Sequence, residues 1–200
     1  MNTERSKIVK KGYPCHEWRF TSDLKELVKT SSALYSDRVY LRYKNKNGDG
    51  TSDVTYLEFD EMIDALGTSF YAMGLQKKHI AVIGETSPEW IATYLATVNG
   101  GGVIVPLDKE LSFDEIGNFL VRAKVSCVVF SPKFRENFEK LSETMPELVF
   151  VEIGDGENFK NEKFTSTKTL IEKGESVRSE TRRFNEDTGK TEHMRYKEDA

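Results

Sequence analysis

Four short apolar runs, separated by segments with helical spacing, constrain the fold of this chain more than any other feature. The runs are Ile80–Ile83, Val103–Val105, Ser126–Phe130 and Leu148–Ile153. A continuous apolar run of this length is typical of a strand that is buried on both faces of a parallel sheet. The alternation of such strands with helices predicts βαβ units. We therefore expect an α/β fold with a doubly wound, mostly parallel sheet.

The segments between the runs carry signals for helix starts and ends. Ser87 can cap a helix whose first residue is Pro88, where the missing N–H costs nothing. The sequence Ser112-Phe113-Asp114-Glu115 is a capping box, and Pro106 ends the strand before it. The expected helices after the first run cover residues 88–99, 113–124, 132–144 and 167–173.

The part of the chain before Ile80 predicts a helix, a β-hairpin and a longer helix. Apolar residues recur at helical spacing from Asp23 to Leu34. Arg38–Lys44 and Val54–Tyr56 read as two strands around the turn cluster Asn45–Gly50. An amphipathic helix from about Leu57 to Met73 ends at Gly74.

The last 27 residues differ in composition from the rest. They hold almost no apolar side chains beyond Val177, Phe184, Met194 and Tyr196. Burying these four would contribute about 8 kcal/mol, whereas ordering the segment would cost about 40 kcal/mol in conformational entropy. We expect a polar lead-in over residues 1–22, a domain over 23–173, and a tail over 174–200 that is disordered or lies loosely on the surface.

The overall composition excludes several classes of protein. A net charge of −4 and a pI near 5.6 argue against a general nucleic-acid binder, which would show a basic footprint. No apolar stretch is long enough to span a bilayer, and Met1–Lys11 lacks the apolar core of a secretory signal. Cys15 and Cys127 match no metal or disulfide spacing, and Cys127 is expected to be a buried thiol. These features predict a soluble, cytoplasmic protein.

Three short motifs resemble ligand-binding loops but fail on inspection. Asn45–Gly50 resembles a calcium loop, but its twelfth position is Tyr56 where a bidentate Glu is required. Thr188–Thr191 echoes the end of a P-loop, but the position that needs the first glycine is Phe184. Gly100–Gly102 follows a helix and precedes a strand, the reverse of a phosphate cradle. We interpret them as a hairpin turn, a chance match and a helix end.

One loop is placed where open α/β sheets bind ligands. Gly84–Pro88 leaves the carboxyl end of a buried strand and enters a helix N-terminus. Thr86 and Ser87 are also ordinary capping residues, so a connecting role and a ligand-binding role both remain open. The histidines, His16, His79 and His193, lack a local signature for pairing with a nucleophile, and we expect them at the surface.

The ordered series of these segments resembles the N-terminal subdomain of AMP-forming acyl-CoA synthetases, within the adenylate-forming superfamily. The resemblance rests on Ile80-Ala81-Val82-Ile83-Gly84-Glu85, on Ser87-Pro88-Glu89-Trp90, and on Asn99–Asp108 with its Gly-Gly-Gly and Val-Pro-Leu-Asp sequences. It covers about Asp23 to Lys173. The sequence Val-Pro-Leu-Asp-Lys-Glu-Leu at 105–111 most resembles the corresponding sequence of bacterial long-chain fatty acid ligases.

The resemblance implies chemistry that this chain does not carry by itself. The family activates a carboxylate by attack on the α-phosphate of ATP and then transfers the acyl group to a thiol, with ATP, Mg²⁺ and CoA as cofactors. The family's Ser/Thr- and Gly-rich loop that ends in Pro-Lys-Gly should begin soon after Lys173, and no such sequence stands there. No catalytic, cofactor-binding or metal-binding residue can therefore be carried over.

These considerations leave two functional hypotheses. The first is an N-terminal fragment of a fatty acid–CoA ligase, inactive alone, whose partners are the second N-terminal subdomain and the C-terminal domain of the enzyme. Such a fragment could self-associate through its uncovered face. The alternative is a stand-alone, non-catalytic α/β binding or interaction module. Acyl chain length, the acceptor thiol and the oligomeric state do not follow from the sequence.

Overall fold

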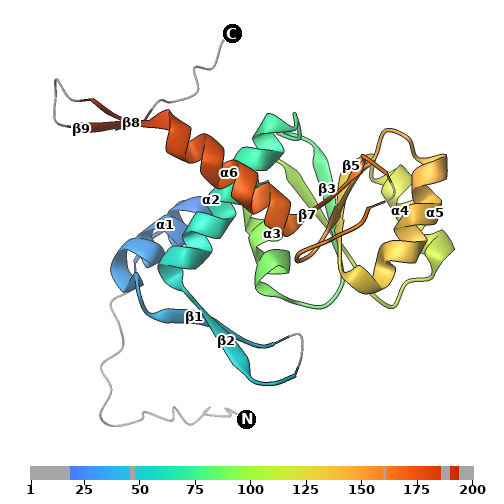
Figure 1. The fold of residues 1–200 in the computed structure, drawn as a ribbon, viewed down its shortest axis with the longest axis horizontal. Coiled ribbons are helices and arrows are strands. Elements are labelled where there is room, and N and C mark those ends of the chain that lie inside the picture. The colour runs from blue at the N-terminus through green and yellow to red at the C-terminus, as the bar shows by residue number, and fades with distance from the viewer. Residues whose placement is uncertain (1–18, 46–47, 160, 186–189, 194–200) are drawn as a thin grey trace, which may run out of the picture.

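The computed structural model of the chain describes residues 19–45, 48–159, 161–185 and 190–193, and side chains up to residue 178. An N-terminal helix and hairpin precede the sheet-forming part of the chain (Figure 1). These first elements are α1 (Leu24–Tyr35), β1 (Val39–Lys44), β2 (Thr51–Thr55) and α2 (Tyr56–Ala72). The hairpin pairs antiparallel, as the sequence predicted.

The central part alternates strands and helices as expected. Its elements are β3 (His79–Ile83), α3 (Pro88–Asn99), β4 (Val103–Leu107), α4 (Phe113–Arg122), β5 (Val125–Phe130), the short 3₁₀ helix η1 (Pro132–Phe134), α5 (Arg135–Thr144), β6 (Val149–Glu152) and β7 (Phe164–Ser166). The three-residue strand β7 was not expected from the sequence. Three residues are too few to show the alternating or continuous apolar pattern by which a strand is predicted from sequence.

The five strands form one parallel sheet in the order β4-β3-β5-β6-β7. The chain enters at β3, adds β4 on one side, and then crosses to the other side to add β5, β6 and β7. The predicted α/β class and the doubly wound parallel sheet are confirmed. Figure 1 shows the sheet between two groups of helices, with α4 and α5 on one side and α2 and α3 on the other.

Each central strand is buried on both faces, which explains its continuous apolar sequence. In β3, Ile80 and Val82 belong to one core cluster, whereas Ala81 and Ile83 belong to the other. The first cluster contains side chains from α2 and α3, and the second contains side chains from α4 and α5. Because both faces are covered, these strands are mostly apolar, and the charged Glu152 at the end of β6 is accommodated by an ion pair with Arg135.

Helix starts follow the capping signals. Ser87 accepts a hydrogen bond from the backbone N–H of Trp90, and Ser112 forms the predicted capping box with Glu115. Thr55 forms a second capping box, with Glu58, so α2 begins at Tyr56 and not at Leu57. The second strand of the hairpin was predicted to end at Tyr56, but β2 ends at Thr55, because Tyr56 is the first residue of the helix.

The predicted end of the strand at Pro106 is wrong. β4 continues through Pro106 to Leu107. Proline lacks the N–H that a central strand would need, but β4 lies at the edge of the sheet and pairs only with β3. An edge strand tolerates proline because the missing donor can face away from the ladder.

The predicted helix end near Lys173 is also wrong. The last helix, α6, runs from Thr167 to Thr181, and the strands β8 (Arg182–Asn185) and β9 (Lys190–His193) form a hairpin after it. Gly174 is buried where α6 crosses α2, and a Cβ there would lie 2.0 Å from the carbonyl oxygen of Ala65. One turn further on, Arg178 bonds to Asp64 at 2.7 Å. Packing on α2 extends the helix beyond its apolar sequence.

Trp90 lies on the side of α3 that faces the first core cluster, but it remains partly exposed. Its ring stacks with that of Tyr94 at a centroid distance of 6.1 Å. Trp90 is therefore only half-buried, since it also lines an open groove beside α1. None of the helices in the described part of the chain is both long and apolar enough to cross a lipid bilayer.

Candidate functional site

The crossover at β3 creates a topological switch point. β3 is followed by β4 on one side and flanked by β5 on the other, so the loops after β3 and β5 leave the carboxyl edge of the sheet side by side. Open α/β sheets bind their ligands in the crevice outside this edge, where the strand order reverses. The loop Gly84–Pro88, which the sequence singled out, lies at this point.

The two loops at the switch point are in direct contact. Gly84 has a φ of 139°, and a Cβ at this position would lie 1.8 Å from the hydroxyl oxygen of Ser131. The backbone N–H of Glu85 donates to that hydroxyl at 3.2 Å, and the N–H of Ser131 donates to the carbonyl of Ile83 at 3.0 Å. Glycine is therefore required at position 84 both for its backbone conformation and for the close approach.

Two lysines converge on one carboxylate beside these loops. Lys133, after β5, bonds to Oε1 of Glu85 at 2.6 Å, and Lys109, after β4, lies 3.6 Å from the same oxygen. The hydrogen bond from Lys133 lowers the pKa of Glu85, so its carboxylate is charged at neutral pH. The three side chains together carry one net positive charge, and all three are exposed. This cluster can attract an anionic group.

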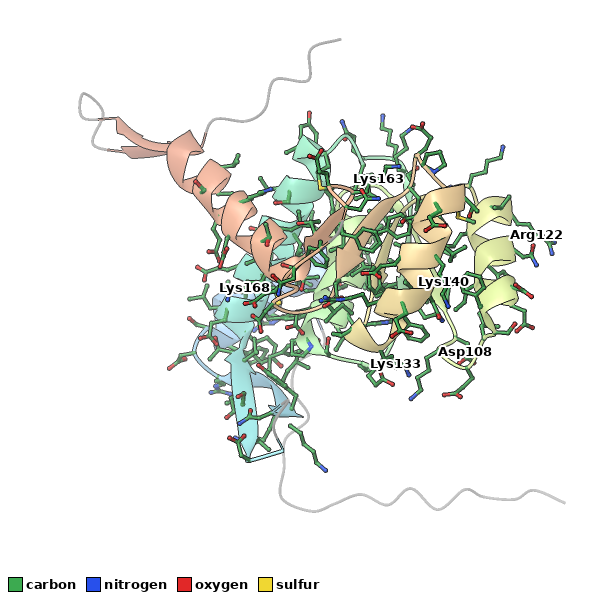
Figure 2. The ribbon with its side chains drawn as sticks, turned by 45° about the vertical axis from the view of Figure 1, so that its right-hand side comes forward. Asp108, Arg122, Lys133, Lys140, Lys163 and Lys168 are labelled. Carbon is green, nitrogen blue, oxygen red and sulfur yellow. The ribbon has the colours of Figure 1, made fainter. Side chains whose placement is uncertain are left out.

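A small cavity of about 310 Å³ lies further along the carboxyl edge, between the end of β6 and the start of α6. Gly154 and Asp155 line one side of it, and Thr167 and Lys168 the other. Thr167 is buried and accepts a hydrogen bond from the N–H of Gly154 at 2.8 Å. Figure 2 shows Lys133 and Asp108 at one end of the sheet and Lys163, which precedes β7, at the opposite end.

An ion pair with a buried carboxylate and a half-buried guanidinium supports the loop after β6. Glu152 is 2% exposed at the carboxyl end of β6 and receives two hydrogen bonds from Arg135, at 2.6 and 2.7 Å. Arg135 also donates to the carbonyl of Glu157 at 3.0 Å, and its guanidinium lies over the ring of Phe159. The sequence analysis missed this pair, because nothing in the spacing of Arg135 and Glu152 indicates that α5 and β6 bring them together.

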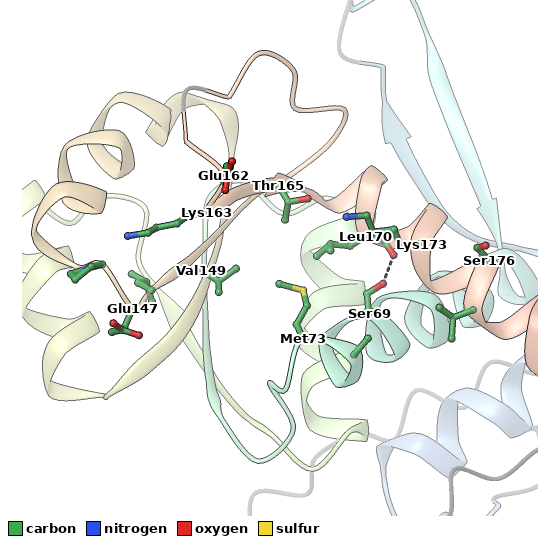
Figure 3. Close-up of a pocket in the computed structure, with 14 residues that line it drawn as sticks. Ser69, Met73, Glu147, Val149, Glu162, Lys163, Thr165, Leu170, Lys173 and Ser176 are labelled. Carbon is green, nitrogen blue, oxygen red and sulfur yellow. Dashed lines mark hydrogen bonds between the residues drawn. The ribbon is translucent and has the colours of Figure 1, made fainter.

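A larger cavity, of about 620 Å³, lies at the other end of the sheet. It separates α2 and α6 from the amino ends of β6 and β7, and Figure 3 shows Ser69 of α2 donating to the carbonyl of Leu170 beside it. Its walls mix Met73 and Val149 with charges of both signs, among them Glu147 and Lys163. We regard the carboxyl edge as the better candidate site, since ligands of parallel sheets bind there and not at the amino ends.

The other residues that the sequence analysis weighed lie outside this site. Asn45 and Gly50 close the hairpin turn through a backbone hydrogen bond of 3.0 Å. Nδ1 of His79 contacts the carbonyl of Ala123 near the amino end of β3. Cys127 is fully buried, as expected. His16, Cys15 and Thr188 lie outside the described residues, and the side chain of His193 is not described.

Metal ligands do not gather in the described part of the chain. No three side chains of His, Cys, Asp or Glu there come together as a metal site requires. Three acidic residues at the carboxyl edge are paired with cations: Glu85 with Lys133, Asp155 with Lys168 and Glu152 with Arg135. We assign no residue of this chain to a metal ion.

Comparison with known proteins identifies one family. The family model of the AMP-binding enzymes matches residues 28–194, which extends past Lys173 through α6 to β9. Among curated relatives, YngI of Bacillus subtilis, whose name is that of an acyl-CoA synthetase, is 24% identical over 75% of this chain and 27% of its own length. The long-chain-fatty-acid–CoA ligase ACSBG2 of Mus musculus is 28% identical over 58% of this chain and 17% of its own. The chain thus spans about a quarter or less of these relatives.

Solved structures share the fold. The anthranilate CoA ligase AuaEII, determined with anthranoyl-AMP, superposes with a TM-score of 0.64 at 16% identity, over 74% of this chain and 27% of its own. Acetoacetyl-CoA synthetase from Streptomyces lividans gives a TM-score of 0.65 at 15% identity, over 74% of this chain and 24% of its own.

Proposed function

Because the chain belongs to the AMP-binding enzyme family, we propose that it forms part of the N-terminal domain of an ATP-dependent, AMP-forming fatty acid–CoA ligase. The observation that carries the proposal is the family match over residues 28–194. The preference for a fatty acid is supported by the long-chain-fatty-acid–CoA ligase among the relatives. In this proposal the rest of the enzyme, a second N-terminal subdomain and a C-terminal domain, completes the active site.

The proposed reaction has two steps. The substrate carboxylate attacks the α-phosphate of ATP and displaces pyrophosphate, and the thiol of CoA then attacks the acyl adenylate and displaces AMP. Phosphoryl chemistry of this kind depends on positioning and on neutralising negative charge. When bound, ATP and CoA supply the phosphates and the thiol. In this proposal, the role of this chain is to bind one of the anionic phosphate groups.

The switch point is the part of the chain that suits this task. Lys109 lies in the turn after β4 and Lys133 in the 3₁₀ helix η1 after β5, and Glu85 neutralises only one of the two charges. A phosphate group of ATP or CoA could replace part of the contact with Glu85 without leaving a charge buried, because the cluster is exposed. We therefore propose Lys133 and Lys109 as an anion subsite of the enzyme.

Calorimetric titration of the 200-residue protein with CoA, and separately with ATP, tests this subsite. Loss of one charge-assisted hydrogen bond to phosphate should weaken binding about tenfold in the Lys133→Ala variant. Lys140→Ala, which removes an exposed lysine from the middle of α5, serves as the matched control and should leave the affinity unchanged. Equal losses in both variants, or no binding of either ligand, would contradict the subsite.

The proposal also predicts what the 200 residues do alone. The family's phosphate-binding loop is missing from the sequence, and such a loop contributes several kcal/mol of charge stabilisation in the transition state. We expect no fatty-acid-dependent exchange of pyrophosphate into ATP above a no-enzyme control. Measurable exchange would show that the chain is catalytically self-sufficient.

A further inference from the structure

Positive charge gathers at the amino edge of the sheet, where the strands begin, at the end opposite to the candidate site. The turn before β3 and the turn before β5 each contribute two exposed cations. The two turns lie side by side, because β3 pairs with β5 and the ring of His79 contacts the carbonyl of Ala123 between them. We call these four cations the amino-edge patch: Lys77, Lys78, Arg122 and Lys124.

No nearby carboxylate in the described part of the chain neutralises this patch. The sequence contains no Asp or Glu from residue 65 to 84 or from residue 116 to 135. None of the four cations forms an ion pair with another described residue. Neighbouring strands are about 4.8 Å apart, and charges interact over about 8 Å at physiological ionic strength. The patch therefore acts as a local group of positive charges, although the whole chain has a net charge of −4.

The backbone of both turns favours glycine, but lysine occupies the position concerned. Lys77 has a φ of 60° and Lys124 a φ of 49°. The first turn is closed by the N–H of Lys78, which donates to the carbonyl of Leu75 at 3.1 Å. In the second, the N–H of Lys124 donates to the carbonyl of Val121 at 3.0 Å. Glycine adopts a positive φ without steric cost, whereas a residue with a Cβ is disfavoured there. Turn geometry therefore does not explain lysine at either position.

Exposed apolar side chains lie among these charges. Val121 directly precedes Arg122 at the end of α4 and is 64% exposed. Val103 is 47% exposed at the start of β4, where its N–H donates to the carbonyl of Lys78 at 2.9 Å. The interface of a bilayer accepts both kinds of side chain, because cations contact the anionic headgroups and apolar groups enter the boundary with the acyl chains. A soluble polyanion offers nothing to the two valines.

We propose that the amino-edge patch binds the surface of a membrane that contains anionic lipids. The cations contact headgroup phosphates, and Val121 and Val103 reach the boundary between headgroups and acyl chains. The five residues of β3 separate this edge from the candidate site by about 16 Å. Figure 2 shows Arg122 at the rim of the molecule, apart from Asp108 and Lys133. The candidate site therefore stays open to water when the patch is bound, and the proposal does not depend on the proposed enzymatic function.

Co-sedimentation of the 200-residue protein with vesicles tests the proposal. The protein should bind vesicles of phosphatidylcholine that contain about 30% phosphatidylglycerol, and binding should weaken as NaCl is raised from about 50 to about 300 mM. Binding to vesicles of phosphatidylcholine alone should be at least about tenfold weaker. Equal binding to the two kinds of vesicle, or no binding to the anionic ones, overturns the proposal.

The double variant Lys77→Gly/Lys124→Gly removes two charges of the patch without straining the fold. Because a lysine near an anionic membrane contributes about 1 kcal/mol, binding to the anionic vesicles should fall about thirtyfold. The midpoint of unfolding in urea should stay unchanged or rise, since glycine suits both turns. A loss of binding in this variant is then not a loss of folding.

The matched control is Lys25→Ala/Lys44→Ala, which removes two exposed lysines from α1 and β1 and gives the same net charge. It should change vesicle binding by no more than about twofold, because these lysines lie outside the patch. An equal loss in the two double variants would mean that binding follows net charge and not this surface, and it overturns the proposal.

Val121→Ala distinguishes a membrane from a soluble polyanion. It should weaken binding to the anionic vesicles about tenfold, as expected when about two carbon groups leave the acyl boundary. Binding to a short DNA duplex, which has no apolar phase, should not respond to this change. Vesicle binding that Val121→Ala leaves unchanged, or a duplex that binds more tightly than the vesicles, overturns the proposal in favour of a soluble polyanion.

Discussion

Cys127 shows how the sheet controls the chemistry of a single residue. It lies in β5 with no exposed surface, and burial raises the pKa of its thiol from 9.0 to about 12. The nucleophilic form is the thiolate, so this thiol is inert at neutral pH despite lying in the same strand that leads to the switch point. The sequence predicted its burial correctly, because its neighbours in the strand are all apolar or small.

The raised pKa of Cys127 predicts a pH dependence of stability. The thiol ionises near pH 9 in the unfolded chain but stays protonated in the folded protein, so the folded state is progressively disfavoured as the pH rises from about 9 to about 12. The free energy of unfolding should fall by about 1.4 kcal/mol per pH unit in this window. Urea titrations at pH 8, 9.5 and 10.5 should show a steeper decline for the wild type than for Cys127→Ala. Parallel curves would show that burial does not hold the proton.

At the scale of the element, glycine explains both the successes and the failure of the sequence analysis. Gly74 was read correctly as a residue that ends a helix, and its positive φ of 70° confirms the reason. Gly174 follows the last strongly apolar stretch and was read as the start of a tail. Its role is instead to let α6 cross α2 closely, and such a role depends on a helix more than a hundred residues earlier. Local pattern predicts ends of elements well, but it does not reveal contacts between distant ones.

The same distinction applies to the candidate site. The loop Gly84–Pro88 was found because strand, loop and helix follow one another in sequence. Ser131, Lys133 and Lys109 were not found, because they reach the site from β5 and β4 through the strand order. Arg135 and Glu152 were missed for the same reason. When the strand order of a sheet assembles a site, the sequence pattern can identify each loop separately but does not show which loops come together.

A pair of glycine substitutions tests the helix crossing. Gly174→Ala would push a methyl group into the backbone of Ala65, and we expect a loss of at least 1–3 kcal/mol of stability from overpacking. Gly67→Ala in α2 is the matched control, since its Cβ would lie 3.9 Å from the nearest atom. It should stabilise the protein by up to about 1 kcal/mol through helix propensity. Chemical denaturation gives both values, and an equal response would mean that α6 does not pack as described.

At the scale of the whole molecule, the sheet couples two cores. The cluster with α2 and α3 and the cluster with α4 and α5 are built on alternate residues of the same strands. A change in one cluster therefore alters strands that the other cluster also needs. We expect the two faces to unfold together as one cooperative unit, although helices from different parts of the chain cover them.

Phe138 and Trp90 lie on opposite faces and can test this coupling. Phe138 on α5 has no exposed surface and packs against Phe130 at 4.5 Å between ring centroids, so Phe138→Ala should cost about 3–5 kcal/mol. In a Trp18→Phe background, the unfolding midpoint followed by Trp90 fluorescence should fall together with the midpoint followed by circular dichroism. Phe119→Ala removes a side chain of α4 that is 44% exposed. It should change the free energy of unfolding by no more than about 0.5 kcal/mol, so both midpoints should stay close to those of the wild type. If Trp90 kept its wild-type midpoint in Phe138→Ala, the α2–α3 face would be stable without the other, and the sheet would not transmit the loss of packing between its faces.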